Sequence, residues 1–118
     1  MSNEIVIYIT EVVKSPLCVS TEDGQIVHDA IAPFIRGGKP IVISFTGVTT
    51  LISAFLNSAI GQLYGEFPED RIRELLSVRD MAADDLELLK RVNDNAKLYF
   101  QNRPAYDKAW KEEVGDEE

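Results

Sequence analysis

The chain has 118 residues, of which 45% are hydrophobic and 27% are charged, and its formal net charge is −8. This length suits one domain, whose core is large enough to fold without a metal or a disulfide, and the lone cysteine, Cys18, excludes an internal disulfide. The acidic balance argues against DNA, RNA and anionic membranes as partners, because the nearest approach to a basic cluster, Arg71 with Arg73, lies among acidic neighbours.

The first third of the chain predicts a strand, a second short strand and a helix. Residues 4–13 are rich in Ile, Val, Tyr and Thr, which favours a strand, and residues 17–20 predict a short one. The pair Asp23-Gly24 predicts a turn, with Asp23 or Thr21 capping the helix that follows. This helix ends at Gly37-Gly38, and its apolar face consists of Ile26, Val27, Ala30, Ile31 and Phe34.

The middle of the chain predicts the centre of the fold. Residues 39–45 form a compact apolar run with β-branched members, which is typical of a buried central strand. A loop over residues 48–52 then leads to a helix over residues 53–67. The predicted core contains nine residues: Val42, Ile43, Phe45, Ile31, Phe34, Leu56, Ile60, Leu63 and Leu89.

Two further elements complete the predicted domain. Residues 71–78 are interpreted as an edge strand, and residues 82–101 show the clearest helical periodicity in the chain. Pro104 breaks this helix, so residues 1–103 are the expected domain and residues 104–118 an appended short helix with an acidic tail. Strands that alternate with helices in the order β(β)αβαβα predict an α/β fold with a mixed sheet of about four or five strands.

The sequence offers no pattern that indicates an enzyme, a metal site or a bound cofactor. His28 is interpreted as a helix-surface residue and Cys18 as a small buried apolar one, and a Cys–His catalytic pair would require the fold to bring the two together. Asp84, Asp85 and Glu87 are acids at the start of a helix, with a metal site as the alternative. Glycine-rich phosphate loops are absent from the sequence. The amino-terminal residues lack the basic segment of a secretory signal, and no apolar run reaches the roughly 20 residues of a membrane span, so we expect a cytoplasmic protein.

The segment from Val42 to Tyr64 carries the most specific functional signal. A strand leads through a polar loop to Ser53, where a helix begins. The simplest interpretation is that Ser53 is a helix N-cap whose hydroxyl accepts from the backbone N–H of Phe55 or Leu56. The functional interpretation is a regulatory phosphate, since a phosphoserine adds nearly two negative charges to a surface.

This segment resembles the STAS domain, the module of sulfate transporters and anti-sigma-factor antagonists. The strand is residues 41–45, the loop residues 46–52, and the phosphorylatable serine of that family corresponds to Ser53. It is still more similar to uncharacterised STAS-like bacterial families, which combine an early Asp-Gly, a strand followed by Gly-Val, and a segment like SAFLNSAIGQLY. Ile52 and Phe55 stand where typical STAS members carry Asp and Gly.

The resemblance implies a non-enzymatic regulatory module of bacterial signalling that binds an ATPase or serine-kinase-like protein and is switched by phosphorylation. The expected partner-binding surface consists of Thr49, Thr50, Ser53, Asn57 and Ser58. A homodimer is compatible with this interpretation. The alternative is a sensor for a small ligand or nucleotide, which would bind in the crevice at the ends of the strands. A deep pocket with converging polar groups would favour the sensor, and an exposed apolar patch beside Ser53 would favour the partner module.

Overall fold

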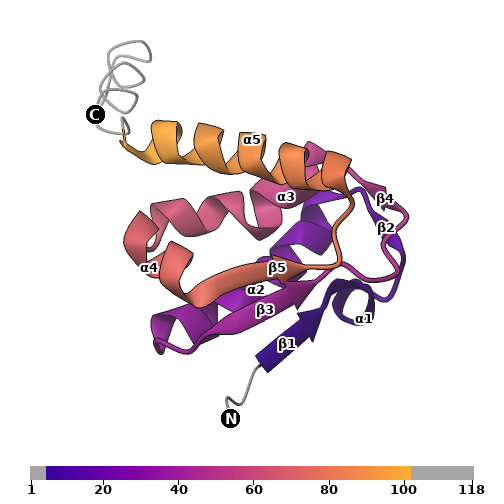
Figure 1. Cartoon of the computed structure of the whole chain (residues 1–118), viewed down its shortest axis with the longest axis horizontal. Helices are drawn as coiled ribbons and strands as arrows, with labels where there is room; N and C mark the ends of the chain where they lie inside the picture. Colours follow the sequence, from indigo (N-terminus) through magenta and orange to yellow (C-terminus); the bar gives the residue numbers. More distant parts are fainter. Residues whose placement is uncertain (1–4, 102–118) are drawn as a thin grey trace, which may run out of the picture.

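The computed structural model describes residues 5–101. Figure 1 shows a small sheet in front of a set of helices, with a short two-stranded ribbon at one end. The elements in chain order are β1 (Ile5–Tyr8), α1 (Ile9–Val13), β2 (Leu17–Cys18), α2 (Thr21–Arg36), β3 (Ile41–Ser44), β4 (Thr50–Leu51), α3 (Ser53–Ala59), the 3-10 helix η1 (Gly61–Gly65), α4 (Glu69–Leu75), β5 (Leu76–Arg79) and α5 (Ala83–Gln101).

The strands pair in parallel throughout the described part of the chain. The larger sheet has the order β1-β3-β5, in register so that Ile5, Ile41 and Leu76 lie side by side. The smaller sheet consists of β2 and β4, with Leu17 opposite Thr50. The α/β class and the number of strands are therefore confirmed, but the strands form two parallel sheets and not one mixed sheet. The reason is that the chain leaves the larger sheet after β3, turns at Gly47 with a φ of +82°, and pairs with β2.

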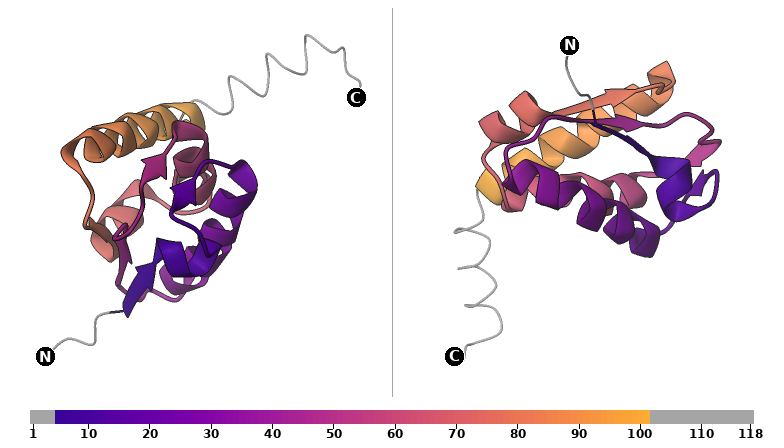
Figure 2. Two further views of the ribbon diagram at one scale, coloured as in Figure 1. Left: turned by 90° about the vertical axis from the view of Figure 1, so that its right-hand side faces the viewer. Right: turned by 90° about the horizontal axis from the view of Figure 1, so that it is seen from below.

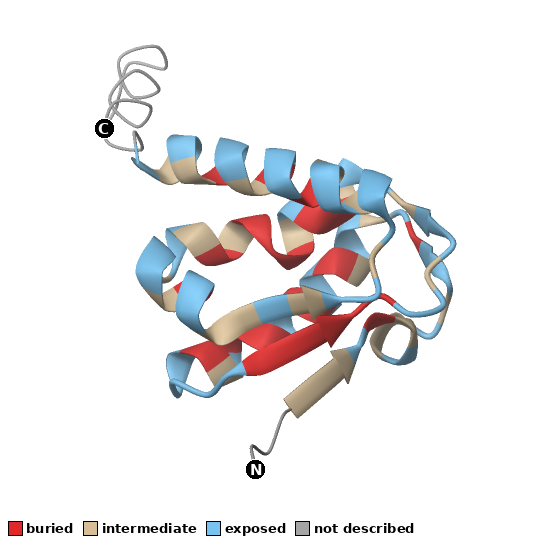
Figure 3. Ribbon diagram, viewed as in Figure 1, coloured by how far each residue is buried: buried red, intermediate tan, exposed pale blue. Residues whose placement is uncertain are grey.

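The core lies between the larger sheet and the helices. Every residue of β3 is buried, as expected for the strand at the centre (Figure 3). Figure 2 shows α2 and α3 on the same face of the sheet. Eight of the nine predicted core residues are buried, and Phe34 is partly buried against them. The convergence of the helix stripes on β3 is therefore confirmed, but Ile26, which was predicted on the apolar face of its helix, is 49% exposed.

Two boundaries in the first third of the chain differ from the prediction. The strand predicted over residues 4–13 ends at Tyr8, and the chain continues as α1 until Lys14, whose φ of +61° ends that helix. The predicted turn at Asp23-Gly24 is wrong, because both residues lie in the first turn of α2. Ser20 is the N-cap of this helix, and its Oγ accepts from the backbone N–H of Asp23 at 3.0 Å.

Two elements in the second half of the chain also differ in part from the prediction. The helix predicted over residues 53–67 is α3 up to Ala59 and then η1, since Gly61 and Gly65 are poor α-helix formers. The edge strand predicted over residues 71–78 begins as helix α4 after Pro68, and only Leu76–Arg79 is strand. That strand is at an edge of the sheet, as predicted. The helix predicted over residues 82–101 is confirmed as α5.

None of the helices in the described region is long and apolar enough to cross a membrane. The predicted carboxyl-terminal extension, residues 104–118, lies outside the described residues. The boundary at residue 103 therefore stays a prediction, although α5 extends to Gln101, close to the predicted end of the domain.

Candidate functional site

The ribbon of β2 and β4 positions the segment that leads into α3. The backbone N–H of Thr49 donates to the carbonyl of Pro16 at 2.9 Å, and the backbone N–H of Ile52 donates to the carbonyl of Cys18 at 3.2 Å. These two bonds bracket the paired residues of β4 and hold the chain up to the start of α3. Ser53 is therefore presented from an ordered ribbon and not from a free loop.

Three large apolar side chains around this ribbon are exposed to solvent. Leu17 is 45% exposed, Val19 43% and Ile52 39%. Leu17 lies in β2, Val19 directly follows β2, and Ile52 directly follows β4. The backbone N–H of Ile52 bonds to the carbonyl of Cys18, the residue before Val19, so Val19 and Ile52 are neighbours. We call these three residues the ribbon patch. It is adjacent to Ser53, since Ile52 immediately precedes that serine.

Ser53 is exposed, but it is not the helix cap that the sequence predicted. It is the first residue of α3, and the N-cap is Ile52, which has an extended backbone. No side chain caps this helix, and the backbone N–H of Leu56 bonds to the carbonyl of Ile52 at 3.3 Å. The prediction fails because the helix begins one residue earlier than a Ser53 cap requires. The Ser53 hydroxyl is thus not needed as a cap for α3.

The other four predicted partner-binding residues do not share one environment. Thr49 and Thr50 are exposed on the ribbon, and Asn57 is exposed one turn after Ser53. Ser58 is partly buried, and its hydroxyl donates to the backbone carbonyl of Thr21 at 2.7 Å. Ser58 therefore belongs to the contact between α2 and α3 and not to the surface that Ser53 shares with the threonines.

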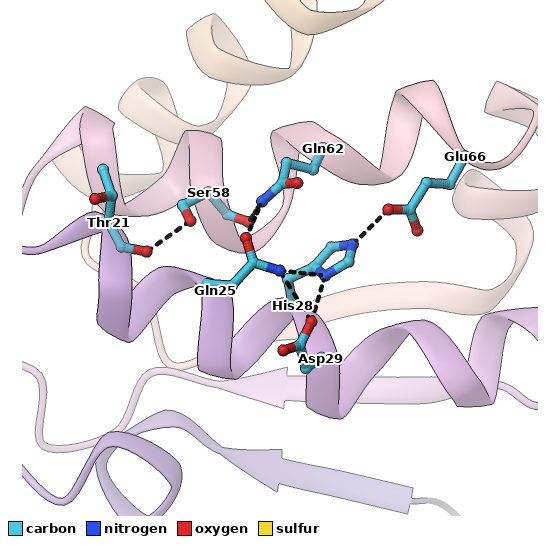
Figure 4. A network of polar contacts seen from close by, with 7 residues as sticks. All are labelled: Thr21, Gln25, His28, Asp29, Ser58, Gln62 and Glu66. Atoms are coloured by element: carbon cyan, nitrogen blue, oxygen red, sulfur yellow. Dashed lines mark hydrogen bonds and ion pairs between the residues drawn. The ribbon is translucent and has the colours of Figure 1, made fainter.

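A network of polar side chains joins α2 to α3 and η1 (Figure 4). Its centre is His28, which is only 6% exposed, so its interpretation as a surface residue was wrong. The Nε2 atom of His28 lies 2.9 Å from Oε2 of Glu66, and its Nδ1 atom lies 3.0 Å from Oδ1 of Asp29. The hydrogen bond to His28 lowers the pKa of the exposed Asp29 carboxyl. Gln62 adds a second bridge by donating to Oε1 of Gln25 at 2.9 Å.

This network has a structural role that sequence reasoning missed. Both ring nitrogens of His28 face carboxylates, so the ring cannot serve as a base for Cys18 without losing these contacts. The spacing of Gln25, His28 and Asp29 on one helix is a signal for mutual contact, since residues three and four apart are neighbours. Glu66, in contrast, is 38 residues away from His28 in the sequence and reaches it only through tertiary packing.

The environment of Cys18 disfavours a nucleophilic thiolate. Burial raises its pKa to about 11, and the negative charges of Asp23 and Asp85 act in the same direction. A thiol reacts as the thiolate, so this residue is inert near neutral pH. Its interpretation as a small buried apolar residue is confirmed, because it is fully buried in the core. Within residues 5–101, no group of three or more His, Cys, Asp or Glu residues could hold a metal ion.

The polar groups at the carboxyl ends of the strands satisfy one another. Ser44 at the end of β3 is fully buried, and its hydroxyl donates to Oδ2 of Asp80 at 2.9 Å. The Ser44 oxygen also accepts from the backbone N–H of Thr46 at 3.3 Å. The sensor interpretation places a ligand-binding crevice at this end of the strands. The serine at its centre is already hydrogen-bonded within the protein.

The comparisons with known proteins identify a family. Residues 23–86 match the family described as "STAS-like domain of unknown function (DUF4325)". This match covers more than half of the chain and extends from the first turn of α2 into α5, so it includes the network, β4 and Ser53. The searches of curated proteins and of solved structures gave no match. The chain thus belongs to the STAS-like family, in agreement with the resemblance of its central segment.

Proposed function

We propose that this protein is a non-enzymatic regulatory module of bacterial signalling that binds another protein through the ribbon patch and Ser53. The observation that carries the proposal is the ribbon patch itself, three large apolar side chains that are 39–45% exposed around one ribbon. Scattered exposed apolar residues are ordinary, whereas a group of them beside polar residues is typical of a protein-binding surface.

The surroundings of the patch support the same function. Thr49, Thr50 and Ser53 are exposed and supply hydrogen-bonding groups at its margin. Interfaces of this kind combine an apolar centre with a polar rim. The ribbon is held by backbone bonds, so binding needs little ordering of the loop, and this lowers the entropic cost of association.

We further propose that phosphorylation of Ser53 switches binding off. The hydroxyl is exposed and has no cap function in α3, so a phosphate can be added without loss of a structural bond. Asp23 and Asp85 already place negative charge near Cys18 on the adjoining strand. A phosphoserine would add nearly two negative charges directly beside Ile52 and would oppose burial of the patch. The partner that membership of a STAS-like family favours is an ATPase or serine-kinase-like protein, in the cytoplasm.

The first experiment compares two matched apolar-to-polar variants. Ile52→Ser removes part of the ribbon patch, and Ile26→Ser removes an equally large side chain that is 49% exposed on α2. A protein from the native host that is retained by the parent chain and by Ile26→Ser, but lost with Ile52→Ser, is the candidate partner. Titration of that purified protein should then show binding to Ile52→Ser weakened by roughly 1–3 kcal/mol. Equal binding of both variants would refute the assignment of the surface.

The second experiment tests the switch with Ser53→Asp and Ser53→Ala. Neither variant should change the free energy of unfolding by more than about 0.5 kcal/mol, because the side chain is exposed and caps nothing. Ser53→Asp should weaken binding of the partner by roughly 1–3 kcal/mol, whereas Ser53→Ala should leave it unchanged. The switch hypothesis must be dropped if Ser53→Asp binds as tightly as the parent protein.

A further inference from the structure

A pocket of about 250 Å³ lies between β5, α4 and α5, away from the ribbon patch. In Figure 1, α4 leads directly into β5, and α5 lies above this strand. Five apolar side chains from these elements and from the neighbouring Ile60 line the pocket: Ile60, Ile72, Leu76, Val78 and Leu89. An apolar cavity of about 150 Å³ already holds benzene in a well-studied protein, so this volume suits a molecule of one or two rings.

One polar side chain in the wall of this pocket has an unmet hydrogen-bonding requirement. Asn93 lies on α5 one turn after Leu89, and both line the pocket. The Oδ1 atom of Asn93 is buried and has no hydrogen-bond partner among the described residues. A buried acceptor without a partner is costly and rare in native proteins. The torsion that orients an asparagine amide is soft, so rotation about it would present this oxygen to a donor in the pocket.

The charged residues at the rim of the pocket are already paired with one another. Nζ of Lys97 lies 3.1 Å from Oε2 of Glu69, and Nη1 of Arg73 lies 3.3 Å from the same oxygen. Arg73 also contacts Asp70 through Nη2 at 2.8 Å. Nζ of Lys97 also lies 4.0 Å from Oδ1 of Asp94. The two cations therefore face three carboxylates, and neither cation is left for an anionic ligand to neutralise. A neutral ligand matches this rim and the apolar walls.

We infer that this pocket binds a small neutral molecule with an apolar body of one or two rings and one N–H or O–H group that donates to Asn93. This site is separate from the ribbon patch, and its test is independent of the proposed partner. The inference combines three observations: the apolar walls, the paired charges at the rim and the partnerless oxygen of Asn93.

The test uses three probes of nearly equal shape with the full-length protein. Indole carries an N–H donor, benzofuran carries an oxygen acceptor in the same position, and indene carries neither. Each is titrated into the ¹⁵N-labelled protein, and the backbone amide resonances of Val78 and Leu89 report binding. We expect saturable shifts with indole, and a dissociation constant roughly three- to tenfold lower than those for indene and benzofuran, as one hydrogen bond predicts.

Matched variants separate the role of Asn93 from apolar binding in general. Asn93→Leu should remove the preference for indole while indene still binds, and Asn95→Leu, at an exposed position of the same helix, should retain the preference. The inference is overturned if indole produces no saturable shift, if indene or benzofuran binds the parent protein as tightly as indole, or if Asn93→Leu keeps the preference. Should Asn93→Leu fail to fold, the comparison of the three probes on the parent protein still decides the matter.

Discussion

The contact between α2 and α3 depends on the absence of a side chain at Gly24, so Gly24→Ala is expected to destabilise the protein. Gly24 is buried in the first turns of α2. A Cβ atom there would lie 2.6 Å from the backbone carbonyl oxygen of Phe55 and 2.7 Å from Cβ of Ser58. Neither atom is the end of a flexible side chain, so the two helices must separate until these distances reach about 3.4 Å. The bond from Ser58 to the Thr21 carbonyl crosses the same contact.

The expected magnitude is the difference between two opposing effects. Ala favours the helical state over Gly by roughly 0.8–1.0 kcal/mol, which would stabilise α2. Overpacking of a close contact costs roughly 1–3 kcal/mol, and a rigid backbone carbonyl places this case at the upper end. The net expectation is a loss of about 2 kcal/mol in the free energy of unfolding. The sign of the change therefore reports whether α2 and α3 approach as closely as the structure shows.

The assay is urea denaturation of the full chain, followed by far-ultraviolet circular dichroism. Gly37→Ala is the matched control, because Gly37 has a φ of −84° and a Cβ there would meet its nearest atom at an ordinary 3.4 Å. This control should be neutral or stabilising by up to about 1 kcal/mol. If Gly24→Ala is as stable as Gly37→Ala, the close approach of the two helices is wrong.

Four further predictions concern the core, the network and the domain boundary. Ile60→Ala should cost about 2–5 kcal/mol in a denaturant melt, because Ile60 is 1% exposed, and a change below about 0.5 kcal/mol would mean that it faces solvent. His28→Leu should cost about 1–3 kcal/mol, since it removes the polar bridge from α2 to Glu66, whereas a neutral result would show that the network contributes nothing. The thiol of Cys18 should react with a disulfide reagent at pH 8 far more slowly in the folded than in the unfolded chain. Folding raises the pKa of this thiol from 9.0 to about 11, so the free energy of unfolding should decrease as pH rises through that range. Truncation after Asn102 should leave a folded domain by circular dichroism, because the last buried residue of α5, Ala96, precedes the cut, and an unfolded product would place the boundary further on.

Local patterns in the sequence predicted correctly the elements whose burial is determined by their own residues. The run of residues 41–45 is apolar except for Ser44, so a strand buried on both faces is the structure that accommodates it, and this is confirmed. The helix α5 was predicted almost to the residue because its apolar positions recur at helical spacing between charged ones. The exposure of Ser53 also followed from its place between a polar loop and a helix start.

Tertiary contacts decided the features that connect distant residues. Asp23-Gly24 has the composition of a turn, yet both residues lie in a helix that Ser20 caps. Glycine is needed at position 24 because α3 approaches too closely for any larger residue. A lone histidine in a helix predicts a surface position, yet His28 is buried because Glu66 and Asp29 supply partners for both ring nitrogens. The ribbon patch depends on the parallel pairing of β2 with β4, which brings together segments more than 30 residues apart. Periodicity and local propensity describe what a residue prefers among its neighbours in sequence. The helical Gly24, the buried His28 and the ribbon patch depend instead on which surface each helix or strand meets, and these contacts are fixed only when the whole chain packs.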